Sequence, residues 1–484
     1  MEHLRGRAMG VLIFASFMDL MDATIVNVAL PSIRTSLDAT GEQLEWVVSS
    51  YLLAFAVLMI TGGRLGDMVG RRRMFVIGVL AFTAGSALAC AAPTIGVLLV
   101  ARVVQGAGAA MMVPQVLSSL QALYSPRERA PIYGVIGAVS GMSAVLGPVL
   151  GGWLVSSDAF GIGWRSIFLI NLPIGIALVV LALRWVPETR SEHPLRLDPV
   201  GVLLATTGLL GVVYALVEGR QVDWAPWILA VGAAGLVLLA VFVSQQRRRD
   251  RRTGSALLPM RLFSDRGFSA GLVTQGAFQG ALAGFGLTFT IYVQTGLGWS
   301  AIHAGATMLP FSLGAFVGTA VAVPLGTRLG KVVVVGGALV QAVATVWVLA
   351  TVSEQGDSLS TWSLVPPLVV CGIGLGLLVV PLVDVALATV PTSEAGASSG
   401  TYGTIQQVGA ALGVAVAGTV FFHVVGTSYD AASLRDGLVA ACWVAAAGYA
   451  LAGVASLLLP SRGQVRAHHE ALEHALAADR PVAT

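Results

Sequence analysis

Charged side chains are scarce in this chain of 484 residues. Asp, Glu, Lys and Arg together make up 11% of the sequence, against about 25% in soluble globular domains. Hydrophobic residues make up 56%, which excludes an ordinary soluble fold. The composition therefore predicts an integral membrane protein.

Other absences exclude whole classes of function. The three cysteines, Cys90, Cys371 and Cys442, lie inside apolar runs without metal-ligand spacing, so we expect neither a disulfide nor a zinc site. The seven histidines are scattered, and no HExxH, GxSxG or G-x-x-x-x-G-K-[ST] motif occurs. We therefore expect no enzymatic activity, no metal, no cofactor and no ATP drive. The net charge of +3 is distributed over loops, which argues against a nucleic-acid partner.

Apolar runs recur from one end of the chain to the other. Each is long enough to cross a hydrocarbon core of about 30 Å. We predict about fourteen membrane spans, at residues 9–31, 45–62, 75–92, 95–119, 131–156, 165–186, 199–217, 225–245, 267–297, 301–324, 333–352, 364–388, 399–425 and 436–459. The sequence therefore predicts an all-α protein.

Arginine placement sets the expected orientation. An even number of spans puts both termini on one side, and most loop arginines, such as Arg71 to Arg73 and the 247–252 cluster, fall on that side. The positive-inside rule then makes both termini cytoplasmic. We interpret the 247–252 cluster as an anchor to anionic lipid headgroups. Arginine and alanine usage suggests a GC-rich bacterial genome, and hence a bacterial cytoplasmic membrane.

The connections are short, which leaves function to the membrane region itself. A weak echo between Gly63 to Arg73 and Gly326 to Lys331 indicates two related halves. The predicted domains are a six-helix bundle at 1–190, two linker helices at 191–250, a second six-helix bundle at 251–460 and a cytoplasmic tail at 461–484. The stretch from Leu257 to Phe263 is predicted to lie at the membrane interface with its apolar side chains toward lipid.

One predicted span is crowded with glycine and contains a proline. It carries Gly137, Gly141, Gly147, Pro148, Gly151 and Gly152. Glycine lets a neighbouring backbone approach closely, while a mid-helix proline removes a hydrogen bond and bends the helix. Close and bent packing follows, and an ordinary small-residue packing face is the alternative interpretation.

Four segments resemble signatures of the major facilitator superfamily. They are the loop Gly63-x-Leu65-Gly66-Asp67-x-x-Gly70-Arg71-Arg72-Arg73, the fourth-span segment Leu98 to Ala110, the glycine-proline segment and the first-span segment Met21 to Pro31. With the span count, the resemblance covers the whole chain and is to the fourteen-helix drug:proton antiporters, which are multidrug efflux transporters. The thirteenth-span stretch Ser398 to Gly409 also resembles this subfamily. The chain departs from the family pattern at Met21, Met68 and Gln406.

The resemblance implies the major facilitator fold, with two pseudo-symmetric six-helix bundles plus two extra helices. It also implies that the loop Gly63, Asp67, Gly70, Arg71, Arg72 and Arg73 is a latch between the halves that holds the outward-open state. A carboxylate and arginines at a helix-loop junction can form such a charge cluster. The alternative is that the arginines only set topology.

Ionisable residues inside the predicted spans are few and costly, so each is expected to have a partner or a task. They are Asp19, Asp22, Arg102 and Asp384, with Glu218 and His423 near span ends. At about 1.5 Å per residue, Asp22 and Arg102 reach similar depth, so we expect them to interact. Burial favours a neutral carboxyl and a nearby arginine favours the ionised form, so alternation between the two would load and release protons.

Asp22 is thus the first candidate proton carrier, and a static ion pair is the alternative. Asp19 lies one helical turn earlier, and Asp384 lies nearer the cytoplasmic end of its span. For a substrate pocket, Gln279, Phe285, Phe289 and Tyr292 form a stripe at helical spacing, although such stripes also serve packing or face lipid. Further candidate lining residues are Asn27, Tyr51, Gln105 and Gln407.

The sequence favours a proton-driven monomeric exporter of small, lipophilic or cationic drugs or antibiotics, acting in the lipid bilayer by alternating access. Two alternatives stay open on the same fold: a dedicated exporter of one secondary metabolite, and a proton-coupled importer. A membrane sensor or lipid enzyme would need a signalling domain or a catalytic constellation, and we find neither. The motifs concern proton coupling and conformational change rather than the substrate pocket, so they do not predict the identity of the substrate.

Overall fold

The computed structural model describes residues 2–124, 126–158, 161–190, 197–253, 256–258, 260–388, 395–461 and 463. Within these ranges every regular element is helical. Thirteen membrane-span candidates are long and apolar enough to cross a bilayer, and α5, with 31 residues, is a fourteenth helix of sufficient length. The predicted all-α membrane fold with about fourteen spans is confirmed.

Seven helices form the N-terminal half. They are α1 (Glu2–Leu37), α2 (Gly41–Val69), α3 (Arg71–Cys90), α4 (Ile95–Leu123), α5 (Pro126–Ser156) and the pair α6 (Ser166–Leu169) and α7 (Asn171–Trp185), which share one span. Two additional helices follow, α8 (Pro199–Glu218) and α9 (Pro226–Thr253).

The C-terminal half starts at α10 (Arg266–Ile291), which continues as a π-helical turn, Tyr292–Gly296. The next span is broken at Met308 into α11 (Ala301–Thr307) and α12 (Leu309–Leu329). The remaining helices are α13 (Lys331–Gln355), α14 (Thr361–Leu387), α15 (Ala395–Val425) and α16 (Ala431–Ser456).

Several helices begin at a residue whose side chain caps the first turn. Thr40 and Gln43 form a reciprocal capping box at the start of α2. Asp265 and Asp430 accept a backbone N–H at the starts of α10 and α16. These polar turns lie outside the apolar runs, which is why most helices are longer than the spans predicted from hydropathy.

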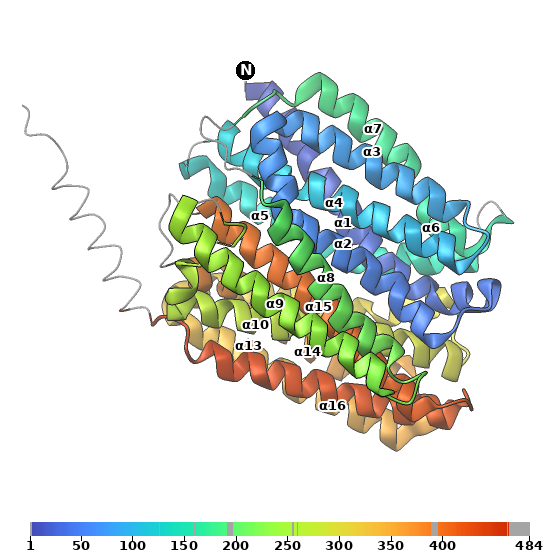
Figure 1. The fold of residues 1–484 in the computed structure, drawn as a ribbon. Helices are drawn as coiled ribbons and strands as arrows, with labels where there is room; N and C mark the ends of the chain where they lie inside the picture. Colours follow the sequence, from blue (N-terminus) through green and yellow to red (C-terminus); the bar gives the residue numbers. More distant parts are fainter. Residues whose placement is uncertain are drawn as a thin grey trace, which may run out of the picture.

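Two helix pairs make the main contacts between the halves. Helix α2 packs along α15, and α5 packs against α11. Helix α8 contacts both α2 and α15, while α9 packs mainly on α8. Figure 1 shows this pair in green, crossing in front of α15 between the blue N-terminal half and the yellow-to-red C-terminal half. The two additional helices therefore cover one side of the junction.

Glycine permits a very close helix crossing in the C-terminal half. An ideal Cβ added to Gly413 of α15 would lie 2.1 Å from the carbonyl oxygen of Gly280 on α10. No side chain fits at that distance, so the two backbones touch directly, as small-residue interfaces in membranes allow.

The prediction that the Leu257 to Phe263 stretch turns its apolar side chains toward lipid is wrong. Leu257 and Leu262 are only 6% and 5% exposed. The backbone N–H of Leu258 donates to Gln246 on α9, and Arg64 on α2 donates to the carbonyl oxygen of Ala256. These polar contacts hold the segment against the protein, where Leu257 and Leu262 are buried and Leu258 is half-buried.

Candidate functional site

A buried ion pair joins α1 to α4. Asp22 is 0% exposed and Arg102 is 1% exposed, and 2.6 Å separates Arg102 Nη1 from Asp22 Oδ2. A lone buried charge costs several kcal/mol, on the order of what its partner returns. The predicted contact between these two residues is therefore present, and each residue supplies the other's counter-charge.

Two amides complete the coordination of Asp22. Its Oδ1 accepts hydrogen bonds from Gln105 Nε2 at 3.2 Å and Asn171 Nδ2 at 2.7 Å. Both amides also donate to Ser86 Oγ, at 2.8 Å and 3.3 Å. Helices α1, α4 and α7 thus meet at one carboxylate, and Ser86 of α3 joins them through the two amides.

Arg102 has further partners that hold it when Asp22 changes. Its Nε donates to the Val47 carbonyl oxygen at 3.1 Å, and its Nη1 donates to Gln105 Oε1 at 2.9 Å. The guanidinium also lies over the Tyr51 ring, 4.3 Å from the centroid, a cation–π arrangement. The Tyr51 hydroxyl donates to Asp19 Oδ1 at 2.5 Å, so the second acid is linked to the arginine through one aromatic side chain.

We call Asp19, Asp22, Tyr51, Ser86, Arg102, Gln105 and Asn171 the buried charge network. Tyr51 and Gln105 were predicted as substrate contacts and lie here among the charges. Ser86 and Asn171 are missed by sequence reasoning because neither is ionisable; Asn171, a polar residue opening an apolar helix, was the available signal. Asp384 lies apart, exposed on α14.

The glycine-proline helix serves two different interfaces. An added Cβ at Gly147 would lie 1.9 Å from Thr24 Oγ1, and one at Gly151 would lie 2.5 Å from Ile25, so both pack on α1. Gly152 instead faces the other half, with its added Cβ 2.5 Å from the Ala301 carbonyl oxygen of α11.

The reciprocal contact is Gly305 on α11, whose added Cβ would lie 2.2 Å from the Pro148 carbonyl oxygen. The side-chain surroundings of Gly137 and Gly141 lie outside the described residues. Within the described part, α5 therefore joins the halves through Gly152 and Pro148.

The charged residues at the junction of α2 and α3 contact the N-terminal half. Arg71 Nη2 lies 2.9 Å from Asp67 Oδ1, and Arg71 Nη1 donates to the Ser118 carbonyl oxygen of α4. Arg72 and Arg73 approach Glu188 after α7, at 3.8 Å and 3.7 Å.

Two loop glycines meet the same half. Gly70 has a φ of +122°, and its added Cβ would lie 2.5 Å from Glu188 Oε1, while that of Gly63 would lie 3.5 Å from Pro114 on α4. The described partners of Asp67, Gly70 and Arg71 to Arg73 all belong to the N-terminal half, so a latch to the other half stays a prediction for another conformation.

Asp198 is a buried acid that the sequence does not single out. It caps α8 by accepting from Gly201 N–H at 3.0 Å, and its Oδ2 accepts from Gln246 of α9 at 2.7 Å. Arg249, from the predicted lipid anchor, lies 3.5 Å from Asp198 Oδ1 and donates to the Leu197 carbonyl oxygen. Arg249 therefore joins α9 to the start of α8, whereas the other arginines of the 247–252 cluster keep their predicted role as a lipid anchor.

We expect Asp198→Asn to destabilise the protein at pH 7. Burial alone raises the pKa of Asp198, but hydrogen bonds from Gly201, Gln246 and Gln245 and the charge of Arg249 bring it below its ordinary value. The carboxylate thus contributes stability above its unfolded pKa of about 3.9, and loses it as pH falls through the lower folded value. Charged hydrogen bonds of this kind contribute about 1.5–3 kcal/mol.

Thermal unfolding of the purified protein in detergent measures this loss. The difference between Asp198→Asn and the parent should shrink as the pH is lowered below about 4. Asp436→Asn is the matched control, because Asp436 is exposed and its ion-pair partner among the described residues is its neighbour Arg435. Equal melting of Asp198→Asn and parent at pH 7 would remove Asp198 from the stabilising contacts.

The predicted aromatic stripe on α10 is mostly buried. The Phe285 and Phe289 rings pack 5.4 Å apart, and the Tyr292 hydroxyl donates to the Gly356 carbonyl oxygen at 3.4 Å. Asn27 Nδ2 lies 3.5 Å from the Ala23 carbonyl oxygen of its own helix, and Gln279 and Gln407 are half-buried. Their role in substrate binding stays a prediction.

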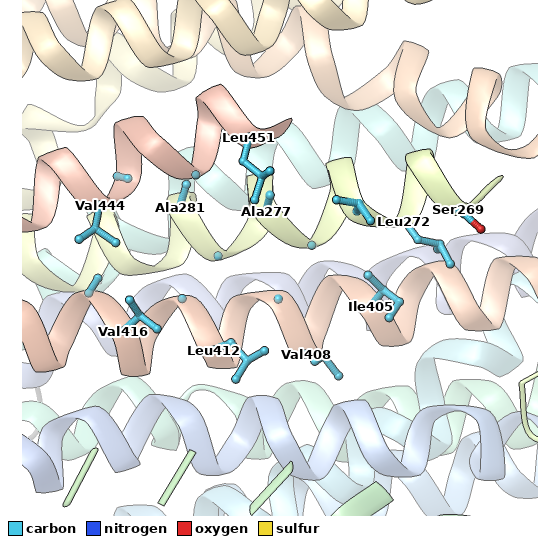
Figure 2. Close-up of a pocket in the computed structure, with 18 of the residues that line it drawn as sticks. Ser269, Leu272, Ala277, Ala281, Ile405, Val408, Leu412, Val416, Val444 and Leu451 are labelled. Atoms are coloured by element: carbon cyan, nitrogen blue, oxygen red, sulfur yellow. The ribbon is translucent and has the colours of Figure 1, made fainter. Parts of the chain in front are cut away.

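A groove of about 570 Å³ lies between α10, α15 and α16. Figure 2 shows Ala277, Ala281, Ile405 and Leu451 among the small and branched side chains that line it. None of the predicted substrate residues lines this groove. Its walls come from the C-terminal half alone, so it is separate from the buried charge network.

The Major Facilitator Superfamily profile matches residues 12–414. Two sequence relatives are the probable actinorhodin transporter of Streptomyces coelicolor, 41% identical over 90% of this chain and 75% of that protein, and a puromycin resistance protein of Streptomyces alboniger, 34% identical over 88% and 82%.

The multidrug resistance protein Stp of Mycobacterium tuberculosis is 34% identical over 84% of this chain and 73% of that protein. Among solved structures, an auto-inhibited POT family peptide transporter superposes with a TM-score of 0.68 at 16% identity, covering 93% of this chain and 95% of that one. At that identity the likeness shows the fold alone, whereas the sequence matches extend over most of the chain. The chain therefore belongs to the Major Facilitator Superfamily.

Proposed function

We propose that the protein is a proton-coupled antiporter that exports small, lipophilic or cationic drugs or antibiotics across the bacterial cytoplasmic membrane by alternating access. The observation that carries this proposal is the buried charge network. It places two acids, Asp19 and Asp22, beside a single arginine, Arg102, inside the membrane-spanning region. Such intramembrane charges mark proton or substrate pathways.

The balance of charge in the network suits antiport. With both acids ionised, two negative charges face one positive charge, and binding one proton makes the network neutral. A proton and a cationic substrate would therefore compete for the same negative charge. Protonation of Asp22 leaves Arg102 held by Val47, Gln105 and the Tyr51 ring, with Asp19 as the remaining counter-charge.

The relatives support export and the choice of substrate class. Their names specify actinorhodin, puromycin resistance and multidrug resistance. A dedicated exporter of one secondary metabolite is the second candidate, favoured by the 41% identity to the probable actinorhodin transporter. Import on the same fold receives no support from these relatives.

The proposal includes cytoplasmic termini, a monomer, and a carrier without enzymatic activity that is driven by the proton gradient without a cofactor. The positions of the arginines support the orientation. The α1–α2 and α15–α16 connections then lie on the outer side of the membrane. We call this end of the helix bundle the outer end.

Inverted membrane vesicles test the proposal. We expect vesicles containing the protein to accumulate an antibiotic or dye when their interior is acidified, and to lose this accumulation when a protonophore collapses the gradient. A panel of compounds distinguishes a multidrug pump from a dedicated exporter. Gradient-independent uptake of every compound, equal to that of vesicles without the protein, would contradict the proposal.

A further inference from the structure

Glu45 is a fully buried acid whose carboxyl group has no hydrogen-bond partner in the described part of the chain. It lies one turn into α2, is 0% exposed, and neither carboxyl oxygen has a partner among the described residues. The sequence does not single it out, because Glu45 is the first residue of the predicted 45–62 span. An acid at that position is expected to lie at the membrane surface. A carboxyl in such a place needs a physical explanation.

The carboxyl group sits at the interface of the two halves. A Cβ added to Gly418 of α15 would lie 2.4 Å from the Glu45 carboxyl carbon, so glycine at this position makes the room that the acid occupies. One turn nearer the outer end, Gly41 meets the Phe422 ring of α15 in the same manner, at 2.7 Å. Closure of α2 on α15 therefore buries Glu45.

No cation balances a charge on Glu45 among the described neighbours. The facing acid on α8 is Glu218, which accepts from Trp46 Nε1 at 2.9 Å. Arg220, after α8, pairs with Glu42 and lies over the Phe422 ring. On α15 the facing residue is Gly418, and His423 further along is exposed. The charge that acts on Glu45 is therefore the like charge of Glu218, while Arg220 is held by Glu42 through Nη2 and its Nη1 has no partner among the described residues.

We propose that Glu45 is a proton-binding site that links closure of the outer end to protonation. An isolated carboxylate costs far more free energy to bury than the neutral acid does. When the halves separate at this end, Gly418 leaves the carboxyl and water stabilises the ionised form. Closing the outer end thus binds one proton, and an acidic exterior favours closing after substrate release.

This inference rests on the proposed function only for its orientation. Its test measures a conformational equilibrium in the absence of substrate and transport. The proposal for Glu45 can therefore fail while the export proposal holds, and the export proposal can fail while that for Glu45 holds. Spin labels at Ser36 and Ser428, both exposed, report the outer end, because Arg34 stacks on Tyr429 between them at 3.5 Å from the ring centroid. The labels are placed in a variant lacking Cys90, Cys371 and Cys442.

Double electron–electron resonance on the protein in lipid gives the closed-to-open ratio between pH 5 and 8. We expect the parent ratio to fall with rising pH by up to about tenfold per unit. Glu45→Gln should stay closed with less than about twofold change, since its neutral side chain binds no proton. Gly418→Ala should open the interface, because its Cβ displaces the carboxyl.

Glu42→Gln is the matched control on the same helix. It removes the partner of Arg220, so it should lower closure at every pH while the pH dependence persists. A parent ratio that does not respond to pH, or a Glu45→Gln variant that keeps the parent response, would overturn the proposal. A Glu45→Gln variant that is open at every pH would overturn it too, since the ionised acid would then be the closing form.

Discussion

Asp22→Asn should abolish proton-dependent export. Asparagine keeps the shape of the side chain but has no exchangeable carboxyl proton, so the network can no longer alternate between a charged and a neutral Asp22. Accumulation in acid-loaded inverted vesicles should fall to the level of vesicles without the protein. In cells, resistance to the transported compound should fall to the same background.

Stability has to be separated from coupling in this experiment. Removing one partner of a buried pair costs about 3–5 kcal/mol, because Arg102 is left without its 2.6 Å contact to Asp22. The double variant Asp22→Asn with Arg102→Gln removes both charges and should recover membrane abundance without recovering export. Asp384→Asn, which changes an exposed acid of the same type on α14, should transport close to the parent level.

Full proton-dependent export by an abundant Asp22→Asn protein would show that Asp22 is not the proton carrier. The Asp22–Arg102 pair would then be a static ion pair that joins α1 to α4. Loss of export in Asp384→Asn alone would place coupling on α14. These variants therefore separate the functions of Asp22, which is buried, and Asp384, which is exposed.

Gly152→Val should prevent closure of the outer end and stop transport. A Cβ at this position would lie 2.5 Å from the Ala301 carbonyl oxygen and 2.6 Å from the Ile302 Cα, both backbone atoms. Backbone cannot rotate away as a side chain can, so α5 and α11 must separate. We expect export at background level and a longer distance between spin labels at Ser157 and Thr295, both exposed near this junction.

Gly286→Val is the matched control, because a Cβ added to Gly286 of α10 meets no atom within 4 Å. It makes the same chemical change within a membrane span and should leave both the distance and export unchanged. A Gly152→Val protein with the parent distance and parent export would show that the close contact is not needed for closure.

Substitutions at Gly147 should act differently from those at Gly152. The sequence groups these glycines into one segment, and family resemblance gives them one role. In the structure Gly147 packs on Thr24, close to Asp22 on α1, while Gly152 packs on the opposite half. The first therefore bears on the charge network and the second on the junction between halves, five residues along the same helix.

The sequence by itself determined the class of protein, the number of spans and the depth of its charges. Hydropathy reports whether a segment tolerates lipid, and a helix rises about 1.5 Å per residue, so the similar depth of Asp22 and Arg102 was predictable and so was their contact. The direction in which each side chain points around its helix is not available from depth.

Tertiary structure decided the partners. Ser86 and Asn171 join the network because α3 and α7 turn those faces inward, and nothing in their local sequence carries a charge signal. Glu45 and Asp198 lie at predicted span edges, where hydropathy cannot distinguish a solvated acid from a buried one. Burial of these side chains depends on which helix packs over them, and that packing is fixed by contacts between residues far apart in the chain, such as Gly418 on Glu45.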